Sequence, residues 1–511
     1  MRPRDTGLGR LVGALAMMLA CVMTAPRVEA QFIQQAKLVG AAAVLPPEYQ
    51  GASVAVSANG NTAILGAPWD YGGSPGAACV YTHSGGVWSQ QDTYLVGTGA
   101  LGWANQGWAV ALSGDGNTAI VGGYTDDGGD GAAWVYTLSG GVWSQQGAKL
   151  LATDGGGLQG SSVALSADGN TAIVGGPDDN LSAGAAWVYT RNGSVWSQQG
   201  AKLVGTGAVN AARQGGSVAL SADGNSAIVG GYTDNDSAGA AWVFTRSGGV
   251  WSQQGAKLVG TGALGPSGQG ISVAMSGDGN TAIVGGYADN TNAGAAWVYT
   301  RSGGVWSQQG AKLVGTGAVD AAQQGNSVSV SADGNTAIVG GYTDNANVGA
   351  AWVYTRSGGV WSQQGAKLVG TGAAGTAQQG ISVALSADGS TAVVGGPSDN
   401  GNTGAAWVFV NSAALGVPGD APRSFALEGV YPNPASSHDL MVRFVLPVRA
   451  AAWLELFDVA GRSVVARDVG MLGAGAHALN LFEHARIRPG LYFVRLRQGA
   501  NGQVRRVTVL E

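Results

Sequence analysis

Short apolar runs, separated by Gly-rich stretches, recur from about residue 31 to residue 410, and no stretch shows a helical period. In the copy from Gln253 to Gly304 the runs predict four strands, at residues 256–259, 272–276, 281–284 and 295–300. An Asp-Gly pair separates the second run from the third, and it favours a tight hairpin because a type I′ turn needs positive φ at both central residues. The pattern predicts an all-β protein.

The same unit recurs seven times. The residue before the turn glycine is Asn59, Asp115, Asp168, Asp223, Asp278, Asp333 and Asp388. A Gly-Ala-Ala-Trp-Val run recurs six times, and Cys79 stands where the first tryptophan is expected. Seven copies of four antiparallel strands, each about 55 residues long, predict a seven-bladed β-propeller over residues 31–410.

The two ends of the repeated region complement each other. The segment that begins at Ile33 matches the segment that begins at Ser252, whereas the last copy stops at Phe409 without that segment. We therefore expect residues 33–39 to pair beside the strand at residues 405–410 and to complete the last blade.

All lysines of the chain occupy one repeat position, and Tyr94 occupies that position in the seventh copy. They are Lys37, Lys149, Lys202, Lys257, Lys312 and Lys367. One interpretation is a cationic ring for an acidic glycan. The alternative, which we favour, is that this strand is the exposed edge of each blade, where lysine discourages edge-to-edge association.

An acidic residue recurs eight positions before each repeat tryptophan. The set is Asp126, Asp179, Asp234, Asp289, Asp344 and Asp399. Sevenfold symmetry places these residues in loops at one end of the propeller, where they are candidates for a shared ligand rim with weak cation affinity. The favoured alternative is turn formation, since Asp and Asn side chains bond their own backbone.

The repeat resembles the FG-GAP repeats of integrin-α-like propellers, in the bacterial variety that has Trp before the Lys-Leu strand. The resemblance rests on the pattern Gln-Gly-x-Ser-Val-Ala-x-Ser-x-Asp-Gly-Asn-Thr-Ala-x-Val-Gly-Gly and on the run from Ile64 to Pro68. Gln replaces the family's Phe, as at Gln269, and the hairpin is too short for the family's calcium loop. The resemblance therefore implies a propeller without that calcium.

Composition narrows the function. Glycine accounts for 89 of the 511 residues, 45% of residues are hydrophobic, and the net charge is −5. The chain has no Gly-X-Y period, which excludes collagen, and its hydrophobic content is too high for a disordered chain. Its acidic net charge offers no basic surface for nucleic-acid binding. No paired catalytic acids, nucleophile elbow or metal-ligand spacing is found, so we expect no catalytic residues, no metal and no cofactor. The off-period Trp69, Trp103 and Trp108 are candidates for stacking on a sugar or for partly buried loop residues.

The first 30 residues have the pattern of a signal peptide. Arg2, Arg4 and Arg10 precede an apolar stretch, and Val28 and Ala30 stand at the −3 and −1 positions of a cleavage site. A lipoprotein signal that ends at Cys21 is the alternative.

The repeat fails after residue 410, and residues 411–424 have the composition of a linker. Strands are expected at residues 440–446, 453–458, 478–482, 490–497 and 504–510, with period-two alternation of apolar and charged residues. Residues 425–511 are therefore predicted to form an immunoglobulin-like β-sandwich.

This segment resembles the type A C-terminal sorting domain of type IX secretion cargo. The resemblance is carried by Tyr431, Pro432, Asn433, Pro434, Gly461, Arg462, Pro489, Gly490 and Tyr492. It implies recognition by the secretion machinery and passage through the outer membrane, often followed by removal of the domain and anchoring to surface polysaccharide. An immunoglobulin-like module like that of flagellar hook-capping proteins is the alternative.

The sequence thus predicts a secreted, monomeric propeller that is displayed on the outer cell surface and binds an extracellular glycan or protein, as an adhesin does. A surface scaffold without a discrete ligand and a polysaccharide-active enzyme are the alternatives. We expect a protein that is not an enzyme.

Overall fold

The computed structural model describes residues 31–40, 49–69, 75–91 and 94–412, and, toward the C-terminus, residues 425–431, 433–437, 440–446, 451–470, 475–482, 487–499 and 501–510. These residues form two compact units, which are described separately. The predicted signal peptide and most of the predicted linker lie outside the described residues. Within the described part of the chain, no helix has the length and apolar character needed to cross a membrane.

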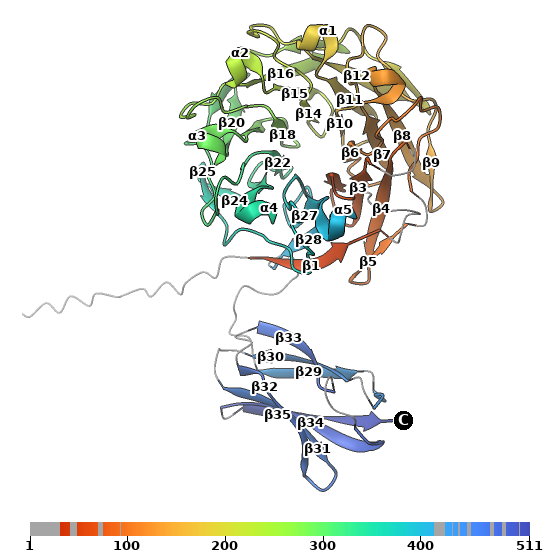
Figure 1. The fold of residues 1–511 in the computed structure, drawn as a ribbon, viewed down its shortest axis with the longest axis vertical. Helices are drawn as coiled ribbons and strands as arrows, with labels where there is room; N and C mark the ends of the chain where they lie inside the picture. Colours follow the sequence, from red (N-terminus) through yellow and green to blue (C-terminus); the bar gives the residue numbers. More distant parts are fainter. Residues whose placement is uncertain are drawn as a thin grey trace, which may run out of the picture. The chain divides into compact units, whose positions relative to one another are not determined.

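The first unit consists of seven four-stranded antiparallel sheets arranged in a propeller-like ring (Figure 1). The first three sheets contain β2 (Ser53–Val56), β3 (Thr62–Ala67), β4 (Ala77–Ser84) and β5 (Val87–Gln90); β6 (Ala109–Leu112), β7 (Thr118–Gly123), β8 (Ala132–Ser139) and β9 (Val142–Gln145); β10 (Ser162–Leu165), β11 (Thr171–Gly176), β12 (Ala185–Asn192) and β13 (Val195–Gln198).

The next three contain β14 (Ser217–Leu220), β15 (Ser226–Gly231), β16 (Ala240–Ser247) and β17 (Val250–Gln253); β18 (Ser272–Met275), β19 (Thr281–Gly286), β20 (Ala295–Ser302) and β21 (Val305–Gln308); β22 (Ser327–Val330), β23 (Thr336–Gly341), β24 (Ala350–Ser357) and β25 (Val360–Gln363). The seventh contains β26 (Ser382–Leu385), β27 (Thr391–Gly396), β28 (Ala405–Asn411) and β1 (Phe32–Leu38).

Main-chain hydrogen bonds between successive sheets form an unbroken circle. The N–H of Ala58 donates to the carbonyl oxygen of Gly114, and an equivalent bond joins each sheet to the next. The N–H of Ala387 donates to the carbonyl oxygen of Ala58 and completes the circle. The N···O distances of these seven bonds are 2.8–3.0 Å. The first strands of the sheets also contact one another in the same cyclic order. The ring is therefore closed by bonding and not by proximity alone.

The closing strand comes from the N-terminal end of the described chain, as the sequence predicts. β1 pairs antiparallel with β28, with Ile33 opposite Val410 and Leu38 opposite Ala406. The prediction that residues 33–39 complete the last sheet is confirmed.

The outer strand of the other sheets differs from the prediction. In the fourth sheet it is β17, in the Val-Trp-Ser-Gln segment, whereas the expected strand at residues 256–259 contributes a single bridge, between Leu258 and Ala241 of β16. The lysine segment thus continues beside β16 after the edge strand β17, and in the seventh sheet Lys37 lies within the edge strand β1 itself.

Small residues allow neighbouring sheets to approach closely. Ala227, Ile228 and Val229 of β15 are fully buried because both faces of the sheet are covered. At Gly230 even a methyl group is excluded, because a Cβ atom there would overlap the carbonyl oxygen of Gly270 in the next sheet. The abundance of glycine and alanine thus follows from the packing of sheet on sheet.

A short turn links the second and third strands in six of the sheets. These turns are η1 (Asp126–Gly129), α1 (Asp179–Ser182), α2 (Asp234–Ser237), α3 (Asp289–Asn292), α4 (Asp344–Asn347) and α5 (Asp399–Asn402). Inside α2, Asn235, Asp236 and Ser237 have φ values of 49°, 55° and 67°. Such a left-handed run is costly for residues other than glycine, so the aspartate that begins each turn needs strong partners.

The second unit contains two antiparallel sheets around one apolar core. One sheet has the order β29 (Ala426–Tyr431), β30 (Met441–Leu446) and β33 (Gly475–Asn480), and the other has β32 (Ser463–Asp468), β31 (Ala452–Asp458), β34 (Gly490–Gln498) and β35 (Asn501–Val509). Phe444, Leu454 and Val494 meet in the core. The sequence missed β29 and β32, which are short and partly polar.

The buried tyrosines of the ring offer a stability test. The Tyr299 hydroxyl is buried and has no hydrogen-bond partner among the described residues, and burial raises its pKa. Phe244 and Phe409 occupy its position in other sheets. We expect Tyr299→Phe to keep or increase the free energy of unfolding, by up to about 1 kcal/mol, because no bond is lost.

The contrasting variant is Tyr189→Phe. The Tyr189 hydroxyl accepts a hydrogen bond of 2.6 Å from Gln159 Nε2, so its removal leaves a buried donor unpaired and is expected to cost about 1–2 kcal/mol. Urea unfolding of both variants measures the difference. Equal losses in the two variants would contradict the assignment.

Candidate functional site

The six repeat lysines and the six repeat aspartates are partners. Each lysine ammonium binds the aspartate that begins the turn of its own sheet; the pairs are Lys149–Asp126, Lys202–Asp179, Lys257–Asp234, Lys312–Asp289, Lys367–Asp344 and Lys37–Asp399. The N···O distance is 2.5–2.7 Å in the five pairs other than the first. The aspartates are buried, with at most 6% of their surface exposed.

Five of the six aspartates also hold the segment that enters their sheet. Asp234 Oδ1 accepts the Val209 N–H at 2.7 Å, and four other sheets repeat this bond. Asp179 differs: its two carboxylate oxygens accept from Lys202, at 3.0 and 2.7 Å. One carboxylate thereby fixes a left-handed turn, an incoming loop and an outgoing loop.

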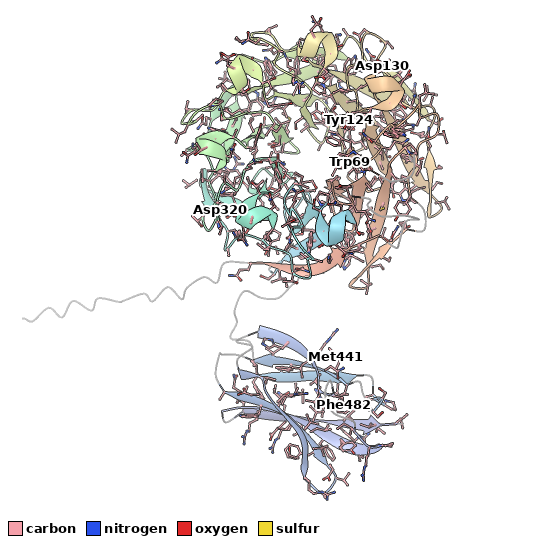
Figure 2. All side chains as sticks on the ribbon, viewed as in Figure 1. Trp69, Tyr124, Asp130, Asp320, Met441 and Phe482 are labelled. Atoms are coloured by element: carbon pink, nitrogen blue, oxygen red, sulfur yellow. The ribbon has the colours of Figure 1, made fainter. Side chains whose placement is uncertain are left out.

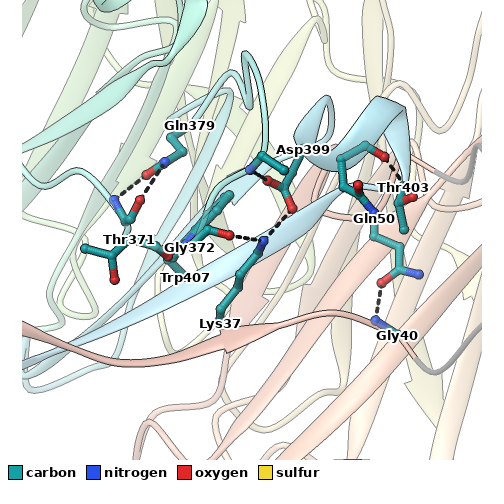
Figure 3. Close-up of polar contacts among 12 residues, drawn as sticks. Lys37, Gly40, Gln50, Thr371, Gly372, Gln379, Asp399, Thr403 and Trp407 are labelled. Atoms are coloured by element: carbon teal, nitrogen blue, oxygen red, sulfur yellow. Dashed lines mark hydrogen bonds and ion pairs between the residues drawn. The ribbon is translucent and has the colours of Figure 1, made fainter. Parts of the chain in front are cut away.

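The close-up at the ring closure shows the same arrangement across the two ends of the unit (Figure 3). Lys37 from β1 reaches Asp399 at 2.6 Å and the Gly372 carbonyl at 2.6 Å. Asp399 accepts the Ala374 N–H at 2.7 Å. The closing strand thus brings the lysine that the last sheet lacks in its own repeat copy.

These contacts bear on both interpretations of the repeated charges. A cationic ring needs free ammonium groups, and a ligand rim needs accessible carboxylates, but here each group is held by the other. The geometry favours a structural role for Asp126, Asp179, Asp234, Asp289, Asp344 and Asp399. Ligand binding by these six residues stays a prediction, and nothing in their geometry supports it.

The Asp-Gly hairpins at the other end of the sheets contain a second set of carboxylates. Asp278 accepts from Ser276 Oγ at 2.5 Å and from the Asn280 N–H at 2.9 Å. Partial burial acts to raise the pKa of Asp278, but the bonds from Ser276 and Asn280 together outweigh it and lower that pKa. Five further turns show the same shift: Asp115, Asp168, Asp223, Asp333 and Asp388.

Three aromatic residues that lie off the repeat gather beside Tyr124, whose position is occupied by tyrosine in three other copies as well. Tyr49 and Trp69 have ring centroids 4.9 Å apart, Trp69 and Trp108 are 5.4 Å apart, and Trp108 and Tyr124 are 4.6 Å apart. We call these four residues the aromatic cluster. Figure 2 labels Trp69 and Tyr124 near each other toward the inner margin of the ring. Trp103, which is 75% exposed, makes no ring contact with the cluster.

Sequence reasoning singled out Trp69 and Trp108 but missed Tyr49 and Tyr124. Both tyrosines could have been found from their positions in the repeat. Tyr49 directly precedes Gln50, which enters the first sheet, and Tyr124 directly follows β7. Comparison of these two repeat positions across the copies would have placed both tyrosines at the same end of the ring as the two tryptophans.

The sorting-motif residues of the second unit meet at one end of its larger sheet. Asp458, opposite Tyr492 in β34, accepts the Arg462 N–H at 3.0 Å and the Arg462 Nε–H at 2.8 Å. Gly461 has a φ of 78°, which the turn between β31 and β32 requires. Backbone hydrogen bonding from Arg462 is the main cause of the lowered pKa of Asp458.

The other two motifs join this end. Asn433 Oδ1 accepts the Thr508 N–H at 3.0 Å, and the N–H of Ala435, which follows Pro434, donates to the Thr508 carbonyl at 2.7 Å. Gly490, after Pro489, pairs with Val509 of the same strand, β35. Pro432 lies outside the described residues, as does the side chain of Tyr431. The three motifs, distant in sequence, therefore converge on β34 and β35.

Comparison with protein families identifies this second unit. Residues 429–510 match the family described as the secretion system C-terminal sorting domain, so the predicted type IX sorting domain is confirmed. No match to a curated protein was found for the chain.

Solved structures with low identity resemble the chain. A fungal alcohol oxidase of the AA5 family in complex with copper is 14% identical, with a TM-score of 0.43, over 94% of this chain and 99% of that chain. Hydrazine synthase from Kuenenia stuttgartiensis is 12% identical, with a TM-score of 0.43, over 69% and 94%. U3-55K is 9% identical, with a TM-score of 0.45, over 73% and 98%.

The buried ion pairs predict a large effect of removing one partner. Lys257→Met leaves the Asp234 carboxylate buried with the Val209 N–H as its remaining partner, so we expect a loss of about 3 kcal/mol in the free energy of unfolding. The double variant Asp234→Asn with Lys257→Met should recover at least half of it, because Asn keeps the acceptor for Val209 and carries no charge. Urea unfolding measures both. A loss below about 1 kcal/mol would mean that the pair behaves like an exposed one.

The hairpin aspartates predict acid sensitivity. Their pKa values are lowered in the folded state, so the stability they contribute is present above the ordinary carboxylate pKa of about 4 and is lost as the pH falls through the lowered values. We expect the triple variant Asp223→Asn, Asp278→Asn, Asp333→Asn to lose less stability than the unmodified chain between pH 5 and pH 2.

Asn59 shows that Asn fits this turn, because its Oδ1 accepts the Asn61 N–H at 3.0 Å. Urea unfolding at stepped pH measures the effect. Identical pH slopes for the variant and the unmodified chain would show that other groups control acid unfolding.

Proposed function

We propose that this chain is exported cargo in which a seven-bladed β-propeller, carried out of the cell by an immunoglobulin-like sorting domain, binds an extracellular ligand at the cell surface in the manner of an adhesin. The observation that supports export is the match of residues 429–510 to the sorting-domain family. A type IX sorting domain directs its cargo to the outer surface or the medium.

The architecture in this proposal is supported separately for each unit. Seven sheets linked by a circle of main-chain bonds, together with the FG-GAP resemblance, support a seven-bladed propeller. In the second unit the Tyr492 hydroxyl donates to the Arg488 carbonyl at 2.9 Å. A tyrosine that bonds the backbone a few residues upstream is typical of immunoglobulin-like sandwiches.

A binding role is supported by the way the ring uses its charges. Six aspartates are held by lysines, and six more are held in their own hairpin turns. Carboxylates committed in this way are poor candidates for general acids and bases, which must exchange protons with a substrate. We therefore propose a binding protein and not an enzyme.

A structural surface scaffold without a discrete ligand is the second candidate. The observation that favours it is the repetition of one ion pair in six sheets, since this pair stabilises the ring and is not directed at any partner.

Deletion of the sorting domain tests the proposal. We expect the full chain to appear on the surface of the native host, where protease added to intact cells removes it, and a chain that ends at residue 417 to stay inside the envelope. Intact mass of the surface product shows which end segments are lost. Attachment of cells that display the ring, compared with cells that lack the gene, tests adhesion.

Equal surface exposure of the truncated chain would contradict export by this domain. Normal display with no change in attachment would favour the scaffold.

A further inference from the structure

Three members of the aromatic cluster break the symmetry of the repeated ring, whereas the fourth, Tyr124, stands where three other copies also have tyrosine. Trp69 follows Pro68 where other copies have Thr233 or Thr343, and Trp108 stands where other copies have Ile271 or Ile381. Tyr49 occupies the place of Gln323 and Gln378. Because these other residues occur in sheets with the same fold, the aromatic rings are not required for folding at those positions.

The cluster combines apolar ring faces with unused polar groups. Trp69 is 38% exposed, and Tyr49, Trp108 and Tyr124 are partly exposed. No described residue forms a hydrogen bond with the indole N–H of Trp69 or Trp108 or with the hydroxyl of Tyr49 or Tyr124. A purely apolar ligand would leave these groups unpaired, whereas a ligand with both C–H faces and hydroxyl groups would pair them.

The surrounding charge argues against an anionic ligand. Residues 31–419 contain 11 Lys and Arg against 21 Asp and Glu, a net charge of −10. The six lysines of this region are bound to aspartates. Arg213 contacts Asp178 at 3.4 Å and the Tyr232 hydroxyl at 3.0 Å. The other four arginines lie over repeat tryptophans, so no cationic side chain of the described residues is shown at the cluster.

We propose that the aromatic cluster is a binding subsite for neutral carbohydrate. This inference rests on the proposed binding function and names its ligand class. The C–H faces of pyranose rings, which carry partial positive charge, lie against the electron-rich faces of the aromatic rings, and sugar hydroxyls pair with the indole and phenol groups. The four partly exposed rings contact one another in a row, which suits a glycan chain better than a stable protein partner, which covers roughly 800 Å².

Substitution by residues from other copies gives matched variants. Trp69→Thr and Trp108→Ile each install a side chain that the ring already carries at that position, so folding should be retained, and thermal unfolding verifies this. Trp103→Ala removes an exposed tryptophan from the same region, outside the cluster, and serves as the control.

The full mature chain and the three variants are titrated by calorimetry with cellohexaose, chitohexaose, mannohexaose and laminarihexaose, and with polygalacturonate as the anionic comparison. We expect at least one neutral hexasaccharide to bind, Trp69→Thr and Trp108→Ile to lower its affinity at least tenfold, and Trp103→Ala to change it less than twofold. Polygalacturonate should not bind.

Absence of binding to all four neutral sugars, or equal binding by the cluster variants, would overturn the proposal. Normal surface display and cell attachment with either of these results would reject the sugar subsite alone and point to a protein ligand. Loss of surface display in the deletion experiment above would instead reject the proposed function.

Discussion

The pairing of β1 with β28 is the contact on which the ring depends. Each sheet buries both faces against its neighbours, so an open row of sheets would expose an apolar face at each end. β1 supplies the outer strand of the last sheet, and Lys37 from the same strand supplies the ammonium for Asp399. The hydrogen bond from Ala387 to Ala58 completes the inner circle. Closure therefore pairs the backbone of the last sheet, covers its apolar faces and neutralises the Asp399 carboxylate.

Close approach of the sheets then determines which residues the repeat can use. In the second strand, glycine is needed where the next backbone leaves no space, as Gly230 shows against Gly270. In the third strand, larger side chains such as Trp242 and Phe244 fill the space between sheets, and both are buried. The mixture of small and large residues thus follows the local space between neighbouring sheets.

The sequence predicted the all-β class, the repeat and its closing strand, because each depends on local patterns that recur every 55 residues or so. It could not show that Lys257 meets Asp234, since the two are 23 positions apart and join only after β16 and β17 have folded between them. The fourth strand was misplaced for a related reason. Val250–Gln253 is half exposed and short, whereas the apolar segment around Leu258 resembles a strand but forms only one bridge.

The same pairing of charges explains where a ligand site can be sought. In each of these repeated sheets the lysine ammonium and the aspartate carboxylate neutralise each other inside the structure. These charged groups therefore hold the turns and are not presented to a ligand. The repeated charges are held by contacts that each repeated sheet makes within itself. Recognition then has to come from positions where one copy departs from the others, and in the described ring the aromatic cluster around Trp69 and Trp108 combines such departures with accessible polar groups.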